Sequence, residues 1–239
     1  MAKIAIIGHG NVGHHFANAL SFDHHVSIYA RNPVPEVNSL SSFKSEGYDF
    51  IFFTVPDDAI KKVADSFQTK EAVVVHTSGS RSMQDLQNHE RRGVIYPLQT
   101  FSKKKQVVFE NLQLFLESSA GIENEIQEIA RCISTKTKFM DSADRAKIHL
   151  AAVFACNFSN HMYHLADSIL SDVNLDFKDI KSLVKETLSK ALELDPKTAQ
   201  TGPAVRNDVS TLALHENLIQ EEQVKEIYRM ITQSIQRTK

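Results

Sequence analysis

A glycine-rich turn near the start of the chain constrains the fold more than any other feature. The motif Gly8-His9-Gly10-Asn11-Val12-Gly13 follows the apolar run Lys3 to Ile7 and opens a helical pattern over Val12 to Leu20. In this context the first glycine permits a tight turn, the second lets the backbone approach a ligand, and the third lets helix and strand pack closely. Three of only 8 glycines stand at this spacing. The motif predicts a dinucleotide-binding turn with phosphates at the helix N-terminus.

The text up to about Asp141 alternates between short apolar runs and amphipathic segments. Several runs are apolar on both faces, which is typical of a parallel sheet covered by helices on each side. The predicted fold class is therefore α/β, with an N-terminal doubly wound Rossmann domain over residues 1–141. Strands are expected at Lys3 to Ile7, His25 to Ala30, Phe50 to Thr54, Ala72 to His76, Gly93 to Ile95, Leu112 to Leu116 and Lys136 to Phe139.

From Ser142 onward the strand-like runs stop and helical spacing continues to the end. Residues 142–239 are therefore expected to form an all-helical C-terminal domain. Helices are expected at Ser142 to Leu170, Asp176 to Leu194, Val209 to Leu218 and Glu221 to Gln236, with a loop over Asp195 to Asn207.

The bulk composition favours a small-molecule partner. Lys and Arg total 27 against 29 for Asp and Glu, so neither nucleic acid nor an anionic membrane is expected as a partner. The longest apolar stretch, Leu150 to Cys156, is shorter than the roughly 20 residues needed to span a bilayer. Cys132 and Cys156 stand in apolar text and are expected to be reduced core residues. With no basic and apolar leader, a cytoplasmic location is expected.

The end of the second predicted strand favours NADP over NAD as the cofactor. An NAD-selective site usually places Asp or Glu about 20 residues beyond the glycine motif, to accept from the ribose hydroxyls. Here the strand ends in Tyr29-Ala30-Arg31-Asn32, and Arg31 is suited to pair with a 2′-phosphate. The alternative is a solvated Arg31 at the end of the strand.

Two further strand ends are expected to line the same crevice, because ligands of open α/β sheets bind beyond the carboxyl ends of the strands. These ends are Thr54-Val55-Pro56 and His76-Thr77-Ser78-Gly79. Pro56 also suits the start of a helix, so a structural role is an equal alternative for that residue.

Together these segments resemble a known group of proteins. The glycine motif, Thr54-Val55-Pro56, His76-Thr77-Ser78-Gly79, Tyr96-Pro97-Leu98-Gln99-Thr100-Phe101 and Thr201-Gly202-Pro203-Ala204-Val205-Arg206-Asn207-Asp208 are similar to Rossmann-like proteins with a C-terminal domain of unknown function. These are usually described as NADP oxidoreductases and are similar to deazaflavin-dependent NADP oxidoreductases and, more distantly, to pyrroline-5-carboxylate reductases. The resemblance covers nearly the whole chain and implies NADP (NADPH) binding and a helical domain that forms a homodimer.

One departure from that group bears on catalysis. The family usually has His before Pro-Leu-Gln, whereas this chain has Tyr96. Because the ordinary pKa of tyrosine is about 10, Tyr96 is a poorer acid or base near neutrality than histidine.

The second half offers few candidates for chemistry. On an ideal helix His149, Asn157, Asn160 and His164 fall within roughly 80° of one another, as one polar stripe. His149 is then the candidate proton donor or acceptor, and Asn157 its neighbour. The alternative is a set of satisfied core or interface groups. No Asp or Glu shares the stripe at ligand spacing, so no metal site is expected.

Arg206 is the candidate for anchoring a carboxylate or the cofactor phosphates, with Asp208 orienting it or capping a helix. An active site is expected between the domains, built from Ser78, Tyr96, Gln99, His149, Asn157 and Arg206. Two functions remain open. One is an NADP-dependent oxidoreductase acting on a small carbonyl, imine or deazaflavin compound. The other is a non-catalytic NADP(H)-binding sensor or regulatory protein.

Overall fold

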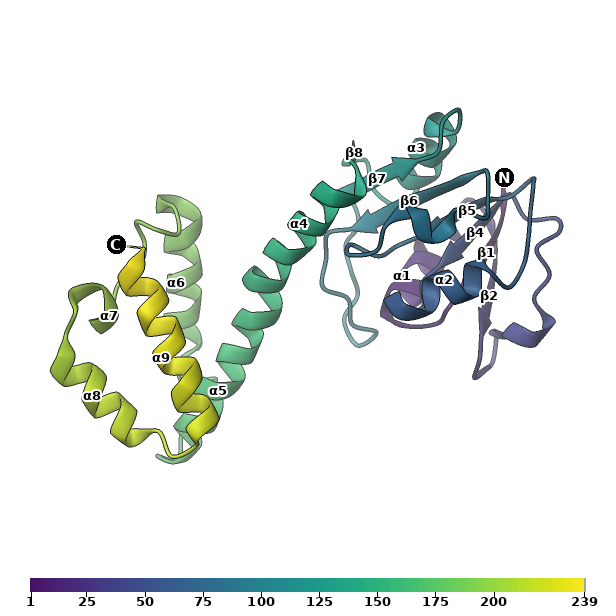
Figure 1. The fold of residues 1–239 in the computed structure, drawn as a ribbon. Helices are drawn as coiled ribbons and strands as arrows, with labels where there is room; N and C mark the ends of the chain where they lie inside the picture. Colours follow the sequence, from purple (N-terminus) through teal and green to yellow (C-terminus); the bar gives the residue numbers. More distant parts are fainter. Residues whose placement is uncertain (239) are drawn as a thin grey trace. The chain divides into compact units, whose positions relative to one another are not determined.

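The chain has two compact units, which are described separately. The structure is a computed structural model and describes residues 1–238. Unit 1 is Met1–Asn157, and unit 2 begins at Phe158. Unit 1 contains the sheet, and the described residues of unit 2 fold only into helices and their connections (Figure 1).

One sheet forms the centre of unit 1. Among the described residues it has eight strands in the order β3-β2-β1-β4-β5-β6-β7-β8, and all neighbours are parallel except β6 and β7. The order reverses at β1, which lies between β2 and β4. Ligands of open α/β sheets bind at such a switch point. The strands are β1 (Lys3–Ile7), β2 (His25–Ala30), β3 (Asn38–Ser39), β4 (Phe50–Phe53), β5 (Val73–His76), β6 (Arg92–Pro97), β7 (Leu114–Ser118) and β8 (Thr137–Phe139).

Alternate side chains of the central strands enter two different cores. In β1, Ile4 packs on the face that α1 and α3 cover, whereas Ala5 packs on the face that α2 covers. Both are fully buried. Because both faces are covered, the central strands are apolar throughout, and the doubly wound fold predicted from that pattern is confirmed. The helices of this unit are α1 (Asn11–Leu20), α2 (Asp57–Ala64), α3 (Glu123–Arg131) and α4 (Ser142–Ala152), with short 3-10 turns η1 (Leu40–Ser42) and η2 (Met83–Leu86).

A π-helical segment interrupts the long helix that begins at Ser142. It covers Val153–Phe158 and connects α4 with α5 (Ser159–Ser171). A π-helix takes an extra residue per turn, so the 100° step of an ideal α-helix does not hold through it. The polar face shared by His149 and Asn157, which was derived with that step, stays a prediction.

The helices of unit 2 have almost no buried side chains. Among its described residues only Ala204 is buried. Large apolar side chains are exposed instead, among them Leu183 at 63%, Leu192 at 78% and Met230 at 71%. The described residues of unit 2 thus form no closed apolar core of their own. Its remaining helices are α6 (Lys181–Leu194), α7 (Pro203–Arg206), α8 (Val209–Leu218) and α9 (Glu222–Arg237).

Most predicted elements are present. All seven predicted strands occur, whereas β3 was missed because a two-residue strand carries no periodic signal. Helix α6 begins at Lys181 instead of Asp176, and the predicted loop contains the short helix α7. The domain boundary at Ser142 stays a prediction, since the secondary structure changes there while the compact units divide after Asn157.

The expectation that the two cysteines lie in the core is wrong. Cys132 and Cys156 are both free and exposed. Cys132 follows the last turn of α3, and Cys156 lies in the π segment. Apolar neighbours in sequence did not place them in the core, because each residue of a helix faces a different direction. Separately, none of the described helices is long and apolar enough to cross a bilayer.

Candidate cofactor and proton-transfer site

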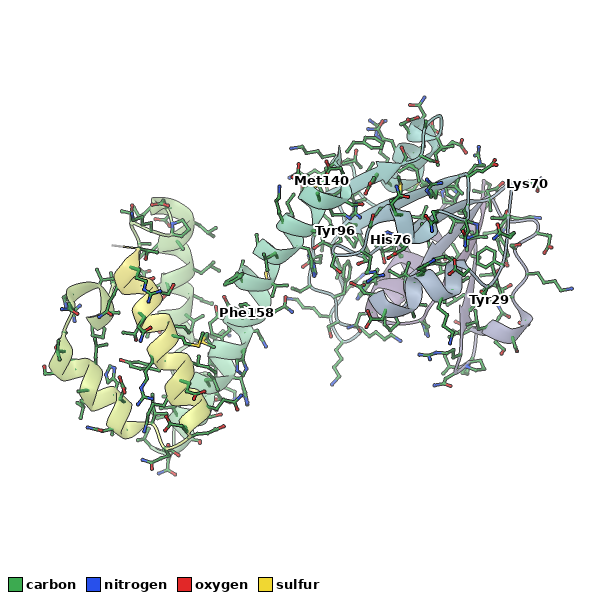
Figure 2. All side chains as sticks on the ribbon, viewed as in Figure 1. Tyr29, Lys70, His76, Tyr96, Met140 and Phe158 are labelled. Atoms are coloured by element: carbon green, nitrogen blue, oxygen red, sulfur yellow. The ribbon has the colours of Figure 1, made fainter. Side chains whose placement is uncertain are left out.

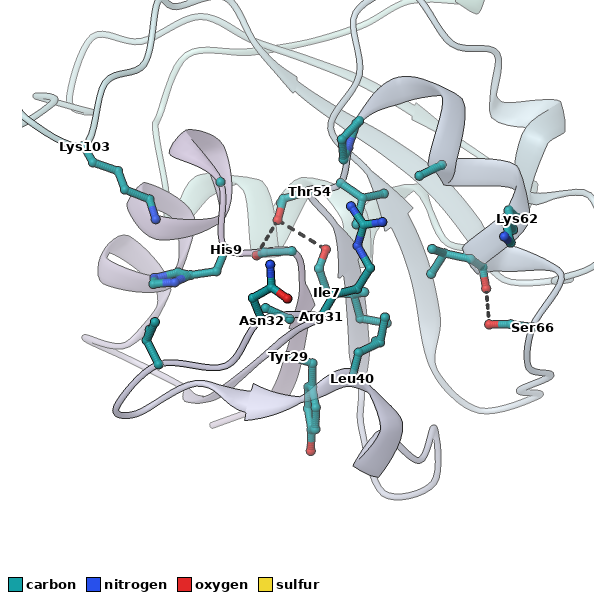
Figure 3. Close-up of a pocket in the computed structure, with 18 residues that line it drawn as sticks. Ile7, His9, Tyr29, Arg31, Asn32, Leu40, Thr54, Lys62, Ser66 and Lys103 are labelled. Carbon is teal, nitrogen blue, oxygen red and sulfur yellow. Dashed lines mark hydrogen bonds between the residues drawn. The ribbon is translucent and has the colours of Figure 1, made fainter.

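A cleft of about 630 Å³ opens at the carboxyl ends of β1, β2 and β4, at the switch point of the sheet (Figure 3). Loops after three neighbouring strands build it, as expected for a dinucleotide site in this topology. The lining residues are Ile7, Gly8, His9, Gly10, Tyr29, Ala30, Arg31, Asn32, Val34, Leu40, Thr54, Val55, Pro56, Ala59, Lys62, Val63, Ser66 and Lys103.

The glycine turn is held against the neighbouring strand end. Gly8 has a φ of 113°, and a Cβ there would lie 2.6 Å from the carbonyl oxygen of Thr54. The Thr54 hydroxyl donates a 2.9 Å hydrogen bond to the Gly8 carbonyl. Only glycine fits this turn, and Thr54 fixes its position relative to β4.

The N-terminus of α1 is open to an anion. Its N-cap is Gly10, which offers no side-chain cap, and no acidic residue stands in its first turn. The first backbone N–H groups of the helix are therefore left for a ligand, and the helix dipole favours negative charge there. The turn and the helix start fit a pyrophosphate.

The charge of the cleft is positive. Arg31, Lys62 and Lys103 line it, and no Asp or Glu belongs to its described lining. Arg31 was predicted from its place at the end of β2. Lys62 and Lys103 were not, because Lys62 lies on the exposed side of α2 and Lys103 in a loop after β6, with no motif to mark either.

His9 stands at the same side of the cleft as Lys103 (Figure 3). Its pKa is lowered, first by desolvation, then by the positive charge of Lys103 and by His14. His9 is therefore mainly neutral at pH 7, and Lys103 supplies the charge beside it.

Five of the residues predicted to bind the cofactor lie outside the cleft lining. Gly13 and Val12 continue α1, where Gly13 is buried. Asn11 accepts a 3.4 Å hydrogen bond from the backbone N–H of Lys103. Ser78 donates a 2.9 Å hydrogen bond to Asp57 at the start of α2. These residues shape the surroundings of the cleft.

His76, the fifth of these residues, stabilises the loop that follows β5. It ends β5 (Figure 2), opposite Val94 of β6, and is fully buried. Its Nδ1 accepts from the backbone N–H of Ser78 at 3.2 Å, and its Nε2 donates to the carbonyl of Ser82 at 3.3 Å. Burial lowers its pKa to about 4, so the neutral ring makes both bonds.

Tyr96 and His149 form a pair at the end of β6. The Tyr96 hydroxyl lies 3.1 Å from Nδ1 of His149, and the two rings meet edge to face at 5.8 Å. Gly79 permits this contact, because a Cβ there would lie 2.7 Å from Tyr96 Cζ and 2.8 Å from the His149 ring. Burial raises the pKa of Tyr96, so its hydroxyl keeps its proton near neutrality. The sequence named both residues but not their contact.

A buried arginine fixes the helix that carries His149. Arg145 is fully buried, pairs with Glu117 of β7, and donates a 2.6 Å hydrogen bond to the Arg81 carbonyl. His149 follows one helical turn later, on the same side of α4. Arg145 thereby sets where α4 lies against the sheet and brings His149 to Tyr96.

Within the described part of unit 1, neither Gln99 nor Asn157 forms a hydrogen bond with this pair. Gln99 is exposed, and its Oε1 accepts from the backbone N–H of Thr100 at 2.8 Å. Asn157 is exposed in the π segment. Arg206 is exposed at the end of α7 in unit 2. Asp208 accepts from the backbone N–H of Thr211 at 3.2 Å, so it caps α8 as one of its predicted roles requires.

Comparison with known proteins gives one matching domain family and several similar structures. The profile of DUF2520, a domain of unknown function, matches residues 112–235. A Bacteroides fragilis protein described as a candidate NADP oxidoreductase is 32% identical, with a TM-score of 0.88 over 99% of this chain and 98% of that one. Among curated proteins none matches significantly.

Two more distant structures share the fold. A reductive aminase from Aspergillus terreus in complex with NADPH and ethyl-5-oxohexanoate has a TM-score of 0.71 at 13% identity, over 99% of this chain and 93% of that one. A Plasmodium falciparum pyrroline carboxylate reductase with NADP bound has a TM-score of 0.61 at 12% identity, over 99% and 98%.

Proposed function

The chain belongs to the DUF2520 family, and we propose that it is an NADP(H)-dependent oxidoreductase acting on a small carbonyl, imine or deazaflavin compound. The observation that carries the proposal is the positively charged cleft over the glycine turn at the switch point of the sheet. The Bacteroides fragilis relative and the two NADP(H)-containing structures of the same fold support it.

NADP(H) is the cofactor that the cleft fits. The open N-terminus of α1 holds the pyrophosphate, and a methyl group added at Gly10 would stand 3.9 Å from its nearest neighbour, so space for a ligand exists there. The guanidinium of Arg31 pairs with the 2′-phosphate. Val34, Leu40 and Ala59 offer apolar walls for the adenine. When bound, the nicotinamide supplies or accepts the hydride.

The Tyr96 and His149 pair is the proposed proton donor. A hydride added to a carbonyl or imine leaves a heteroatom that needs a proton. Tyr96 keeps its hydroxyl proton near neutrality, and His149 at 3.1 Å exchanges protons with it. Such a relay combines a hydroxyl that keeps its proton with an imidazole that lies within hydrogen-bonding distance of it.

Arg206 and Asn157 are the proposed substrate-binding residues. Arg206 ends a short helix that a Gly-Pro turn begins, and its side chain is exposed. A guanidinium in this place suits a carboxylate of the substrate. Asn157 lies in the π segment, and π segments inside α-helices often mark functional sites.

A second candidate function rests on Tyr96. This residue stands where the family usually has histidine, and burial raises its pKa away from neutrality. A chain without an effective acid or base would bind NADP(H) without turnover, as a sensor.

A location in the cytoplasm stays a prediction from the sequence.

Unit 2 is the proposed dimer interface. Its exposed apolar residues lie on several helices, including Leu188 of α6 at 58% and Leu214 of α8 at 57%. Leaving so much apolar surface in water is costly, at about 25 cal/mol per Å². A second copy offers the same surface for a symmetric interface, and two-fold dimers are the commonest closed assemblies.

Binding and turnover of variants test the proposal. We expect wild type to bind NADPH at least about tenfold more tightly than NADH, a difference of about 1.4 kcal/mol. Arg31→Ala should abolish that preference, whereas Arg131→Ala, which removes an exposed charge at the end of α3, should keep it. Equal affinities for both cofactors in wild type would contradict the NADP assignment.

The catalytic assignment has its own test. With the carbonyl or imine that a substrate screen identifies, His149→Ala and Tyr96→Phe should lose turnover while NADPH affinity stays within about twofold of wild type. If both variants keep full activity, the pair is not the proton donor. If no substrate class is turned over although NADPH binds, the sensor function is favoured.

A further inference from the structure

The segment between β6 and β7 packs against α1, whose N-terminus lies at the cofactor cleft. The carbonyl oxygen of Ser102 accepts a 3.0 Å hydrogen bond from Nε2 of His15, which is buried on α1. The ring of Phe101 packs 5.5 Å from that of His15, and the ring of Phe109 packs 6.4 Å from that of Phe16. Two points of the segment are thus fixed to α1, one on each side of Lys103.

These contacts with α1 fix the position of Lys103. Its backbone N–H donates to the side-chain oxygen of Asn11, the first residue of α1. Its side chain enters the cleft beside His9 (Figure 3). Lys104 and Lys105 follow at once in the sequence, yet neither lines the cleft. The three adjacent lysines therefore differ in position, although their sequence alone does not distinguish them.

The positive charge of the cleft favours the binding of an anion next to Lys103. Arg31 lines a different part of the cleft from Lys103 (Figure 3), and no acidic side chain belongs to the described lining to neutralise either. His9, the titratable neighbour, is mainly neutral because desolvation and Lys103 lower its pKa. Asn11 at the start of α1 brings Lys103 close to free N–H groups that themselves favour a phosphate.

We propose that Lys103 is a phosphate-binding residue of the cofactor site, whose ammonium group pairs with a phosphate of the bound dinucleotide. The inference rests on the proposed function and extends it to a residue that no motif marks. The segment that carries Lys103 lies 92 residues from Asn11 in sequence, so it closes one side of a site that the glycine motif opens.

The test compares the three neighbouring lysines. Lys103→Met, Lys104→Met and Lys105→Met are titrated with NADPH and with NADH by fluorescence, and their folding is checked by circular dichroism. Lys103→Met should weaken NADPH binding at least about tenfold, because a charge-assisted bond to phosphate is lost. The other two variants should stay within about twofold, and Lys103→Arg should retain most of the affinity.

The two cofactors identify the phosphate. Equal losses for NADPH and NADH in Lys103→Met assign the pyrophosphate, whereas a loss for NADPH alone assigns the 2′-phosphate, and either result supports the proposal. A folded Lys103→Met variant that binds both cofactors like wild type overturns it, as does an equal loss in all three variants. A wild type that binds neither cofactor overturns the proposed function and this inference with it.

Discussion

Gly8→Ala and Gly10→Ala should separate the structural from the ligand-binding role of the glycine turn. At Gly8 the φ of 113° and a Cβ only 2.6 Å from the Thr54 carbonyl oxygen oppose any side chain. Left-handed backbone costs roughly 1–2 kcal/mol and the clash roughly 1–3 kcal/mol, about 3 kcal/mol together. In a domain of this size that lowers Tm by about 10 °C.

Gly10 differs in both respects. Its φ of −75° and ψ of −165° suit alanine, and its Cβ would meet nothing nearer than 3.9 Å. The lost N-cap preference and the reduced entropy of the unfolded chain oppose each other, so the free energy of unfolding should stay within about 1 kcal/mol of wild type. The methyl group does occupy the space that the pyrophosphate approaches, so NADPH affinity should fall at least about tenfold.

The assay needs two measurements on each variant. Because the chain has no tryptophan, unfolding is followed by far-ultraviolet circular dichroism, and binding is followed by NADPH emission. We expect Gly10→Ala to melt near wild type and bind poorly. Wild-type affinity in Gly10→Ala, or a loss of Tm as large as that of Gly8→Ala, would refute the reasoning.

Three further outcomes follow from the packing. The pKa of His76 is lowered to about 4 in the folded chain, so its contribution to stability is full above about pH 6.5 and is lost as pH falls toward 4. At pH 5 the free energy of unfolding should be about 2 kcal/mol lower than at neutral pH because of this residue. In denaturant titrations, His76→Gln should not show that part of the pH dependence. Arg145→Ala should destabilise unit 1 by about 3–5 kcal/mol because Glu117 loses its buried partner, whereas the same measurement on Lys147→Ala, an exposed residue of the same helix, should change by less than about 1 kcal/mol. Light scattering at micromolar concentration should give twice the mass of the chain, and a monomer mass would contradict the dimer proposed for unit 2.

Local patterns in the sequence determined much of unit 1. The glycine motif is a local signal, because its three glycines stand within six residues of one another. The strands were predicted because a sheet covered on both faces requires unbroken apolar runs such as Lys3–Ile7. The helical spacing after Ser142 is equally local, since each helical hydrogen bond joins residues close in sequence. Arg31 was found because strand ends have a fixed relation to the cleft.

Only the tertiary structure decided which distant residues meet. The sequence named Tyr96 and His149, but their 3.1 Å contact needed the buried Arg145 to set α4 against the sheet. The π segment was not predicted, because a single change of hydrogen-bond register has no reliable sequence signal. Lys103 joined the cleft through contacts with α1, while Lys104 and Lys105, identical in type, did not. Sequence patterns encode periodicity and turns, whereas the position of a side chain in a cleft depends on packing between segments that no local pattern connects.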